Sequence, residues 1–221
     1  MKCEKEGFLK FIPRILRPAV RNFRLLNAGY GHFRTMRQHA SVDRYGNPIP
    51  WYTYPAIEYV KQLDLSQRVI FEYGAGYSSL YYASRCKRII SVEDNPEWYQ
   101  VIKPKAPPNC EILCPETQEQ YVRAIDSFPG SFDIIIIDGS HRELCCQAAV
   151  DRVKDTGMII LDNSDMLPDC VRVLAKKQFI QVDMVGFGPE NGYLWATSFF
   201  LSRGFDFKAC HTKQPTLSVG P

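Results

Sequence analysis

The chain has 221 residues, of which 45% are hydrophobic, and its formal net charge is +3. This length fits one domain of ordinary size, which can build a full core without metal or disulfide staples. Eight cysteines occur at irregular spacing without a Cys-x-x-Cys pair, which argues against a zinc site and favours buried free thiols. We see no cleavable signal segment and no apolar run near 18 residues, and therefore expect a reducing, cytoplasmic setting.

The charge is distributed unevenly along the chain. Residues 1–44 hold ten Lys or Arg against three Asp or Glu, a balance of +7, whereas the remainder holds 17 against 21, a balance of −4. We therefore expect three parts: a basic helical N-terminal extension and loop over 1–50, a mildly acidic main domain over 51–207, and a flexible polar tail over 208–221.

The N-terminal segment 7–26 carries basic residues at helical spacing, with apolar residues largely on other faces. The basic residues are Lys10, Arg14, Arg17, Arg21 and Arg24. Pro13 and Pro18 interrupt this pattern and predict two short helices. Either the segment contacts a membrane or another anionic surface, or it is a cap whose apolar side lies on the domain and whose basic face is solvated. We favour the cap.

An aromatic cluster, Trp51-Tyr52-Thr53-Tyr54-Pro55, follows a loop over 27–50 and leads into a predicted helix over 56–63. A helix just before the first strand of an α/β domain packs on the sheet. The aromatic residues at its start either cover a ligand crevice or belong to the core, and the pattern leaves both interpretations open.

The stretch 68–80 reads as a buried strand that turns sharply through Gly74 and Gly76 into a helix. Such a turn leaves free backbone N–H groups at the helix start, where the dipole favours negative charge. The glycines allow a positive φ and let a ligand lie against the backbone. The pattern lacks the third glycine of the dinucleotide fingerprint and the Lys of a P-loop. Alone, it predicts either a nucleoside site or merely a tight corner.

A second apolar strand, 88–93, ends in an acid about 20 residues after the glycines. In a Rossmann-type crevice an acid at this place faces the ribose hydroxyls, which need acceptors. Glu72, at the end of the first strand, and Glu93 therefore make a pair of carboxylates around one crevice.

Strands and helices alternate from residue 68 onward, which predicts a parallel sheet covered on both faces. Further strands are expected over 110–113, 132–138 and 157–162, and helices over 78–85, 96–102, 118–127, 143–154 and 168–177. The strand 132–138 is the most apolar and belongs at the sheet centre. Segments 179–186 and 193–202 are joined by a short turn and predict an antiparallel hairpin at the sheet edge. The expected fold is α/β, with a Rossmann-like, seven-stranded, mostly parallel sheet.

The pattern Glu72-x-Gly74-x-Gly76-x-Ser78 followed by Glu93 resembles motifs I and II of class I S-adenosylmethionine-dependent methyltransferases, over roughly residues 50–203. The terminal hairpin is characteristic of this class as well. The resemblance implies S-adenosylmethionine as cofactor. Gly74, Gly76 and Ser78 would lie at its methionine part, with Glu72 near the ammonium, and Glu93 would accept from both ribose hydroxyls. The residues implied near the adenine are Asp94 or Asn95 and, more weakly, Glu116.

Polar residues also follow the later strands, at the edge where open α/β sheets bind ligands. The segment Asp138-Gly-Ser-His141 with Asp162-Asn163 resembles small-molecule O-methyltransferases. Metal-dependent members imply Asp138, Asp162 and Asn163 as ligands of Mg²⁺, whereas metal-independent relatives use an acid like Asp138 to contact the cofactor. A structural alternative is that these residues only cap the following helices.

The resemblance implies a methyltransferase acting on a hydroxyl of a small molecule, with His141 and Asp138 as catalytic residues. An imidazole titrates near neutral pH and can take the hydroxyl proton, although His141 can equally be a surface or capping residue. The main alternative function is a cofactor-binding, catalytically silent protein that docks a partner or membrane through its basic arm. Aminopropyl transfer is a third. No base-stacking motif or DNA-reading element is present, so nucleic acid is not an expected partner.

Overall fold

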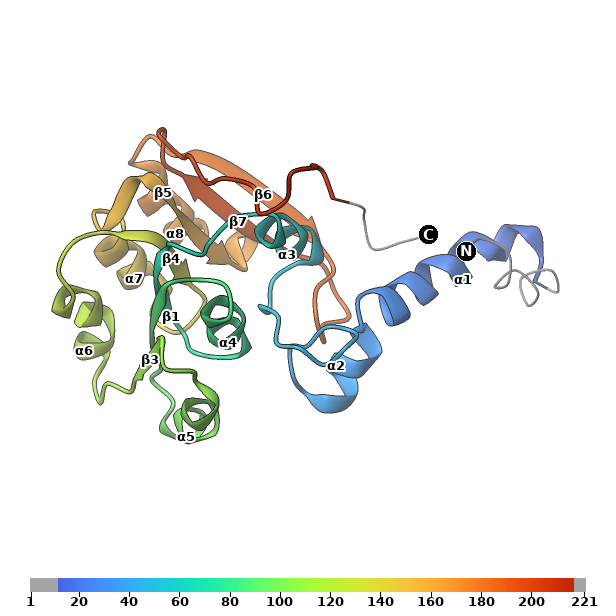
Figure 1. Cartoon of the computed structure of the whole chain (residues 1–221), viewed down its shortest axis with the longest axis horizontal. Helices are drawn as coiled ribbons and strands as arrows, with labels where there is room; N and C mark the ends of the chain where they lie inside the picture. The colour runs from blue at the N-terminus through green and yellow to red at the C-terminus, as the bar shows by residue number, and fades with distance from the viewer. Residues whose placement is uncertain (1–11, 217–221) are drawn as a thin grey trace.

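The computed structural model describes residues 12–216, which form a seven-stranded sheet in the order β3-β2-β1-β4-β5-β7-β6 (Figure 1). Strands β1 to β5 pair in parallel, and β7 runs antiparallel to both β5 and β6. The strand bounds are β1 Val69–Tyr73, β2 Arg88–Val92, β3 Cys110–Leu113, β4 Phe132–Ile137, β5 Val153–Asp162, β6 Ile180–Gly186 and β7 Trp195–Leu201. The predicted Rossmann-like sheet with a C-terminal hairpin is therefore confirmed.

Helices cover both faces of the sheet because each central strand is apolar on both sides. On one face α3, α4 and α5 pack over residues such as Ile70 and Ile134. On the other, α6, α7 and α8 pack over their neighbours Phe71 and Ile135. The helix bounds are α3 Tyr54–Lys61, α4 Tyr77–Ala83, α5 Pro96–Ile102, α6 Gln118–Arg123, α7 Arg142–Ala149 and α8 Pro168–Ala175. The predicted central strand is also confirmed, since β4 pairs with β1 and β5 and is buried throughout.

The boundary between α7 and β5 differs from the expected one. The helix predicted to reach Lys154 ends at Ala149, and β5 begins at Val153, paired with Phe132. A turn over residues 150–152 separates the two elements, and the guanidinium of Arg152 donates to the carbonyl of Gly130 at 2.9 Å. The amide of Phe132 donates to the carbonyl of Arg152 at 2.8 Å, so the turn is tied to the start of β4.

The start of the C-terminal tail is bound to the domain. Lys208 accepts a hydrogen bond from the amide of Asp64, and Cys210 donates its own amide to the carbonyl of Gln62. The expectation of a loose tail therefore does not hold for this part, and residues 217–221 lie outside the described part.

The cysteines are as the sequence predicted: all seven that the structure describes are free thiols, and five of them are buried.

The N-terminal segment consists of a 3-10 turn (Arg14–Leu16), α1 (Arg17–Arg24), a π-helical turn (Leu25–Gly29) and α2 (His32–Gln38). Pro18 does not break it, because a proline in the first turn of a helix removes no intrahelical bond. In Figure 1, α1 projects away from the sheet, and none of its residues is buried. The favoured interpretation of a cap with its apolar side on the domain is therefore wrong for α1, while residues 7–11 lie outside the described part.

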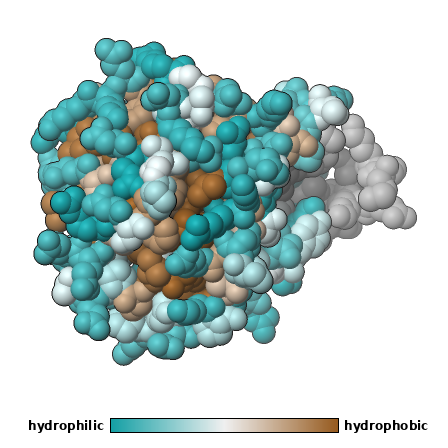
Figure 2. All heavy atoms as spheres, turned by 60° about the vertical axis from the view of Figure 1, so that its left-hand side comes forward, coloured by the Kyte–Doolittle hydropathy of each residue, from teal (hydrophilic) through white to brown (hydrophobic). Residues whose placement is uncertain are grey.

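The surface of the main domain is mostly polar. On the face shown in Figure 2, hydrophilic side chains project outward, and apolar residues are seen mainly in the recesses between them. Within residues 12–216, no helix is long and apolar enough to cross a membrane.

Candidate active site

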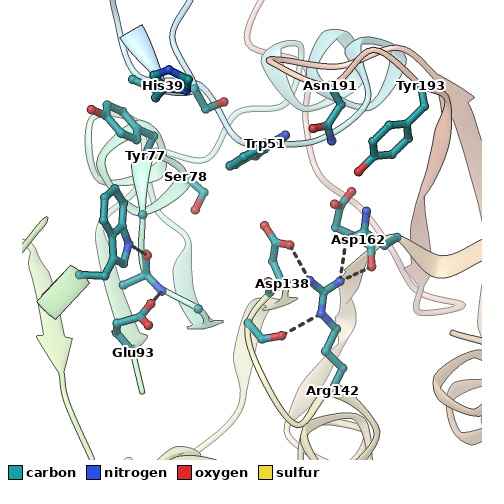
Figure 3. Close-up of a pocket in the computed structure, with 18 residues that line it drawn as sticks. His39, Trp51, Tyr77, Ser78, Glu93, Asp138, Arg142, Asp162, Asn191 and Tyr193 are labelled. Atoms are coloured by element: carbon teal, nitrogen blue, oxygen red, sulfur yellow. Dashed lines mark hydrogen bonds and ion pairs between the residues drawn. The ribbon is translucent and has the colours of Figure 1, made fainter. Parts of the chain in front are cut away.

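A cavity of about 530 Å³ lies at the carboxyl ends of the parallel strands (Figure 3). One side is made by the turn after β1, Gly74–Ser78, together with Glu93 and Trp98. The opposite side is made by residues that follow β4 and β5: Asp138, Gly139, Arg142, Asp162 and Asn163. This cavity lies at the edge of the sheet where the sequence predicted a ligand site.

The turn after β1 lies directly against the turn after β4. Gly74 has φ +94°, and a Cβ built on it would lie 2.6 Å from the amide nitrogen of Gly139. A Cβ on Gly139 would likewise lie 2.7 Å from the Cα of Gly74, so neither position has room for a side chain. Gly76 differs, because its backbone is extended and a Cβ there would meet only the Ser78 hydroxyl, at 4.0 Å. Gly76 therefore leaves space beside the turn.

Glu72 lies behind the glycine turn and does not line the cavity. Its carboxylate is fully buried and accepts hydrogen bonds from the hydroxyls of Ser78 at 2.5 Å, Ser91 at 2.6 Å, and Ser79. Burial raises the pKa of Glu72 to about 7, against the opposing effect of the three hydroxyl donors. Glu72 thus fixes the start of α4, and Ser78, which lines the cavity, stands between it and the open space.

Glu93 does line the cavity, and its two oxygens hold the backbone around it. Oε2 accepts from the amide of Ala75 at 3.1 Å, and Oε1 accepts from the amide of Asn95 at 2.9 Å. The Trp98 indole donates to the carbonyl of Ala75 at 2.7 Å, so the glycine turn is held from two sides. Burial raises the pKa of Glu93 as well, while the backbone donors oppose the shift.

The other residues predicted near the adenine lie off this cavity. Asp94 and Glu116 are not among the lining residues, and Glu116 is exposed. Asp94 faces His141 instead, with 3.8 Å between its Oδ2 and the Nε2 of the ring.

Arg142 was not foreseen from the sequence, and it joins the ends of β4 and β5. Its Nε donates to the carbonyl of Gly139 at 2.8 Å. Nη1 donates to the carbonyl of Asp162 at 2.6 Å and to Oδ1 of Asn163 at 3.0 Å. Nη2 donates to the carbonyl of Asp138 at 2.8 Å and to its Oδ1 at 3.3 Å. These contacts use all five N–H groups of the guanidinium.

The guanidinium of Arg142 is bonded to two of the side chains that were expected to bind Mg²⁺. Two of the three expected ligands, Asp138 and Asn163, direct a side-chain oxygen to it, and the third, Asp162, accepts at Oδ1 from Trp195 and Thr197. Over residues 12–216 no group of three or more His, Cys, Asp or Glu could hold a metal ion. The residues present therefore do not fit the divalent cation that the resemblance implied.

Burial raises the pKa values of both aspartates, and the nearby Arg142 guanidinium opposes this shift in each. Burial raises the pKa of Asp138 to about 6, and the Arg142 guanidinium partly opposes this. The pKa of Asp162 is raised by burial and by the charge of Asp138, while donors from Thr197 and Trp195 oppose the shift. Both carboxyl groups line the cavity.

His141 takes a left-handed conformation, φ 52°, directly before α7. Its ring packs edge-on against Tyr121, with ring centroids 6.0 Å apart, and it does not line the cavity. His141, which the resemblance implied as the base, thus lies beside Asp94 and away from the cavity.

The cavity has a roof made by two segments that are distant in the chain. His39–Ser41 and Trp51 come from the N-terminal side, and Asn191 and Tyr193 come from the loop between β6 and β7 (Figure 3). Trp51 is 42% exposed and lines the cavity, whereas Tyr52 and Tyr54 are buried in the core. One residue of the aromatic cluster therefore covers the cavity while two others belong to the core, so both interpretations apply.

Hydrogen bonds join the two halves of the roof. The amide of Glu190 donates to the hydroxyl of Thr35 at 2.8 Å, and Oε1 of Glu190 lies 3.1 Å from Nδ1 of His39. Nearby, the amide of Tyr54 donates to the carbonyl of Phe187 at 2.6 Å. Sequence reasoning missed these contacts, because loop residues so far apart in the chain carry no periodic signal; only the Gly, Pro and Asn content of both loops marked them as turns.

Known structures share this fold at low sequence identity. A precorrin-6y C5,15-methyltransferase from Geobacter metallireducens GS-15 matches with a TM-score of 0.53 and 18% identity, covering 66% of this chain and 87% of that one. A spermidine synthase in complex with the transition-state analogue AdoDATO matches with a TM-score of 0.50 and 21% identity, covering 66% of this chain and 56% of that one. No family model and no curated protein sequence matches the chain.

The similarity to these known structures and the order of the strands in the sheet indicate the same architecture. The parallel strands and the antiparallel C-terminal hairpin match those expected from the sequence, and the structure adds the strand order β3-β2-β1-β4-β5-β7-β6. This chain therefore has the fold of class I S-adenosylmethionine-dependent methyltransferases, and a cavity lies at the carboxyl ends of its parallel strands.

Proposed function

We propose that the chain is an S-adenosylmethionine-dependent methyltransferase, and that it methylates a hydroxyl of a small molecule. The observation that carries the proposal is the position of Glu93: its buried carboxylate lines the cavity and is bonded to the glycine turn. An acid at the end of the second strand, beside a turn with backbone room, suits a ribose whose two hydroxyls need acceptors. Each oxygen of Glu93 accepts one backbone amide, so each retains a lone pair for a hydroxyl.

The cofactor would lie along the turn Gly74–Ser78, with its ribose at Glu93. The space left at Gly76 lets the methionine part approach the backbone. Glu72 would act on the ammonium through Ser78, whose hydroxyl it holds at 2.5 Å, rather than by direct contact. Asp94 would border the adenine from outside the cavity lining, and we assign no contact to Glu116, which is exposed. When bound, the cofactor supplies an electrophilic methyl group on a sulfonium.

The acceptor would occupy the part of the cavity beneath the roof. Trp51 and Tyr193 offer aromatic surfaces, Asn191 offers a hydrogen-bonding group on the side of Asp162, and His39 offers one on the side of Tyr77 (Figure 3). An aromatic rim with a few convergent polar groups is the usual make-up of a small-molecule site. A small hydroxylated acceptor fits this combination.

A hydroxyl needs to lose its proton as it attacks, and Asp138 is our candidate for the base. Its carboxyl group lines the cavity, and Arg142 fixes its orientation by bonding both its carbonyl and its Oδ1. With a pKa of about 6 it is mostly ionised at neutral pH, where a base of this strength is effective. His141 does not line the cavity, so its earlier assignment as the base has no geometric support, and its place beside Asp94 favours a role at the adenine end.

Binding and turnover test the proposal separately. Isothermal titration with S-adenosylmethionine and S-adenosylhomocysteine should give saturable heats with the folded protein, and absence of binding would refute the assignment. A coupled assay for S-adenosylhomocysteine release over a panel of hydroxylated acceptors should then identify turnover. Binding without turnover on any acceptor would favour the catalytically silent alternative. Because Arg142 is bonded to two of the expected metal ligands, turnover should be the same with EDTA as with added Mg²⁺.

A further inference from the structure

The segment from residue 12 to residue 42 is strongly basic and contains no acidic residue. Its six arginines are Arg14, Arg17, Arg21, Arg24, Arg34 and Arg37. Four of them fall on the 3-10 turn and α1, spaced three or four residues apart, so they share one side of the helix. A helix with this charge and no acids attracts an anionic surface over its whole length.

The opposite side of the same helix is apolar and uncovered. Leu16, Val20 and Phe23 are spaced four and three residues apart, and Ile15 and Ala19 lie beside them at the same spacing. Ile15 is 85% exposed, Leu16 51% and Phe23 64%. Because α1 projects from the sheet in Figure 1, the domain does not cover this side.

A partner for this helix has to satisfy both sides at once. A nucleic acid offers anions but no surface that removes Phe23 and Ile15 from water. The interface of a lipid bilayer offers both, because a helix lying in its plane inserts apolar side chains below the headgroups while arginines reach anionic headgroups. We propose that residues 14–24 form an interfacial helix that docks the protein on an anionic lipid membrane. This docking does not depend on the proposed methyl transfer.

The position of the helix relative to the cavity adds a geometric consequence. From α1 the chain continues through Leu25–Gly29 and α2 to His39, the first roof residue. Thr35, on α2, is bonded to Glu190 at the other half of the roof. A docked α1 is thus connected to the cavity roof through short helices, and the roof stays near the lipid surface.

Vesicle flotation with the full chain tests the docking. The protein should float with vesicles of phosphatidylcholine and phosphatidylglycerol and much less with phosphatidylcholine alone. A variant with Arg14, Arg21 and Arg24 all changed to Gln should bind the anionic vesicles roughly a hundredfold more weakly, since each arginine near such a surface contributes about fivefold. The control variant replaces three exposed cations of the main domain, Arg123, Arg172 and Lys176, with Gln and should bind as the wild type does.

A second pair of variants separates insertion from simple charge attraction. Phe23→Ser should weaken binding to the anionic vesicles by about tenfold or more, because it removes the largest exposed apolar side chain of α1. Val185→Ser, at a 62% exposed apolar position on β6, should leave binding unchanged. Three results would each overturn the proposal. Phe23→Ser could bind as well as the wild type, the control variant of the main domain could lose as much binding as the triple arginine variant, or the wild type could fail to float with anionic vesicles. Thermal melting of each variant verifies that it is folded.

Discussion

Arg142 donates to Oδ1 of Asp138 across 3.3 Å and, through its other Nη, to the carbonyl of Asp162 across 2.6 Å. One side chain thereby fastens the ends of β4 and β5 together and supplies a positive charge beside the partly buried carboxyl group of Asp138 and the buried one of Asp162. These hydrogen bonds, which we call the Arg142 clamp, hold together the cavity wall at the ends of β4 and β5.

Replacing Arg142 with Gln should destabilise the protein by about 2–4 kcal/mol, because it leaves a partly buried carboxyl group without its cation and several carbonyls without a donor. Urea denaturation measures the free energy of unfolding. Arg123→Gln is the matched control, since its ion pair with Asp126 is exposed, and it should change stability by no more than about 0.5 kcal/mol. Equal effects of both variants would contradict the clamp.

Replacing Glu93 with Ala should weaken S-adenosylmethionine binding by roughly 10- to 150-fold, because a charge-assisted hydrogen bond is worth about 1.5–3 kcal/mol. Isothermal titration gives the dissociation constant directly. The exposed Glu119→Ala serves as the control and should bind normally. Unchanged affinity in a folded Glu93→Ala protein would show that the ribose lies elsewhere.

Stability of the protein without ligands should fall as pH rises from about 5 to about 8. The pKa of Glu72 is about 7 in the folded state and 4.5 ordinarily, so the folded state holds the proton more tightly. Its stabilising contribution is complete below the ordinary pKa and is lost as pH rises through 7, up to about 3 kcal/mol in all. Asp138, with a folded pKa of about 6, acts in the same direction.

Glu72→Gln isolates this contribution, because an amide can keep the hydroxyl bonds and does not titrate. Denaturation of both proteins across the pH range should show a flatter dependence for the variant. Glu119→Gln should follow the wild type, since Glu119 is exposed. A wild-type stability that rises over this range would oppose the assignment of a protonated, buried Glu72.

Asp138 and His141 can be compared directly as candidate bases. Asp138→Asn should lower kcat by about 10²- to 10⁴-fold while cofactor affinity stays close to that of the wild type. In the wild type, kcat/KM should rise with pH through about 6 as Asp138 of the free enzyme loses its proton. His141→Ala should keep most of its turnover, because the ring does not line the cavity. The reverse outcome for the two variants would return the role of base to His141.

The sheet could be predicted because its signals are local. The run Ile134–Ile137 is apolar at every position, as a strand buried on both faces must be, and it lies at the sheet centre. The turn at Gly74 and Gly76 was likewise visible in the sequence, and the structure shows that Gly74, with φ +94°, has no room for a side chain.

The arrangement of side chains at the site was less predictable. The acceptors of Arg142 come from the ends of two strands, so nothing within its own helix indicates that all five of its donors are used. His141 was expected to face the cavity because it follows Asp138 closely in sequence. Its backbone instead adopts a left-handed conformation, which aims the ring toward Asp94. The roof depends on the hydrogen bond between Thr35 and Glu190, and no local sequence pattern predicts this contact.

The bond between Thr35 and Glu190 also bears on the order in which the protein is made. A ribosome delivers Thr35 early, but Glu190 follows 155 residues later, after β6 has been synthesised. A growing chain can therefore form the glycine turn and most of the sheet while its cavity is still uncovered. The cavity is enclosed only after Glu190 has been added, so tight retention of a ligand reports that the segments around Thr35 and Glu190 have met.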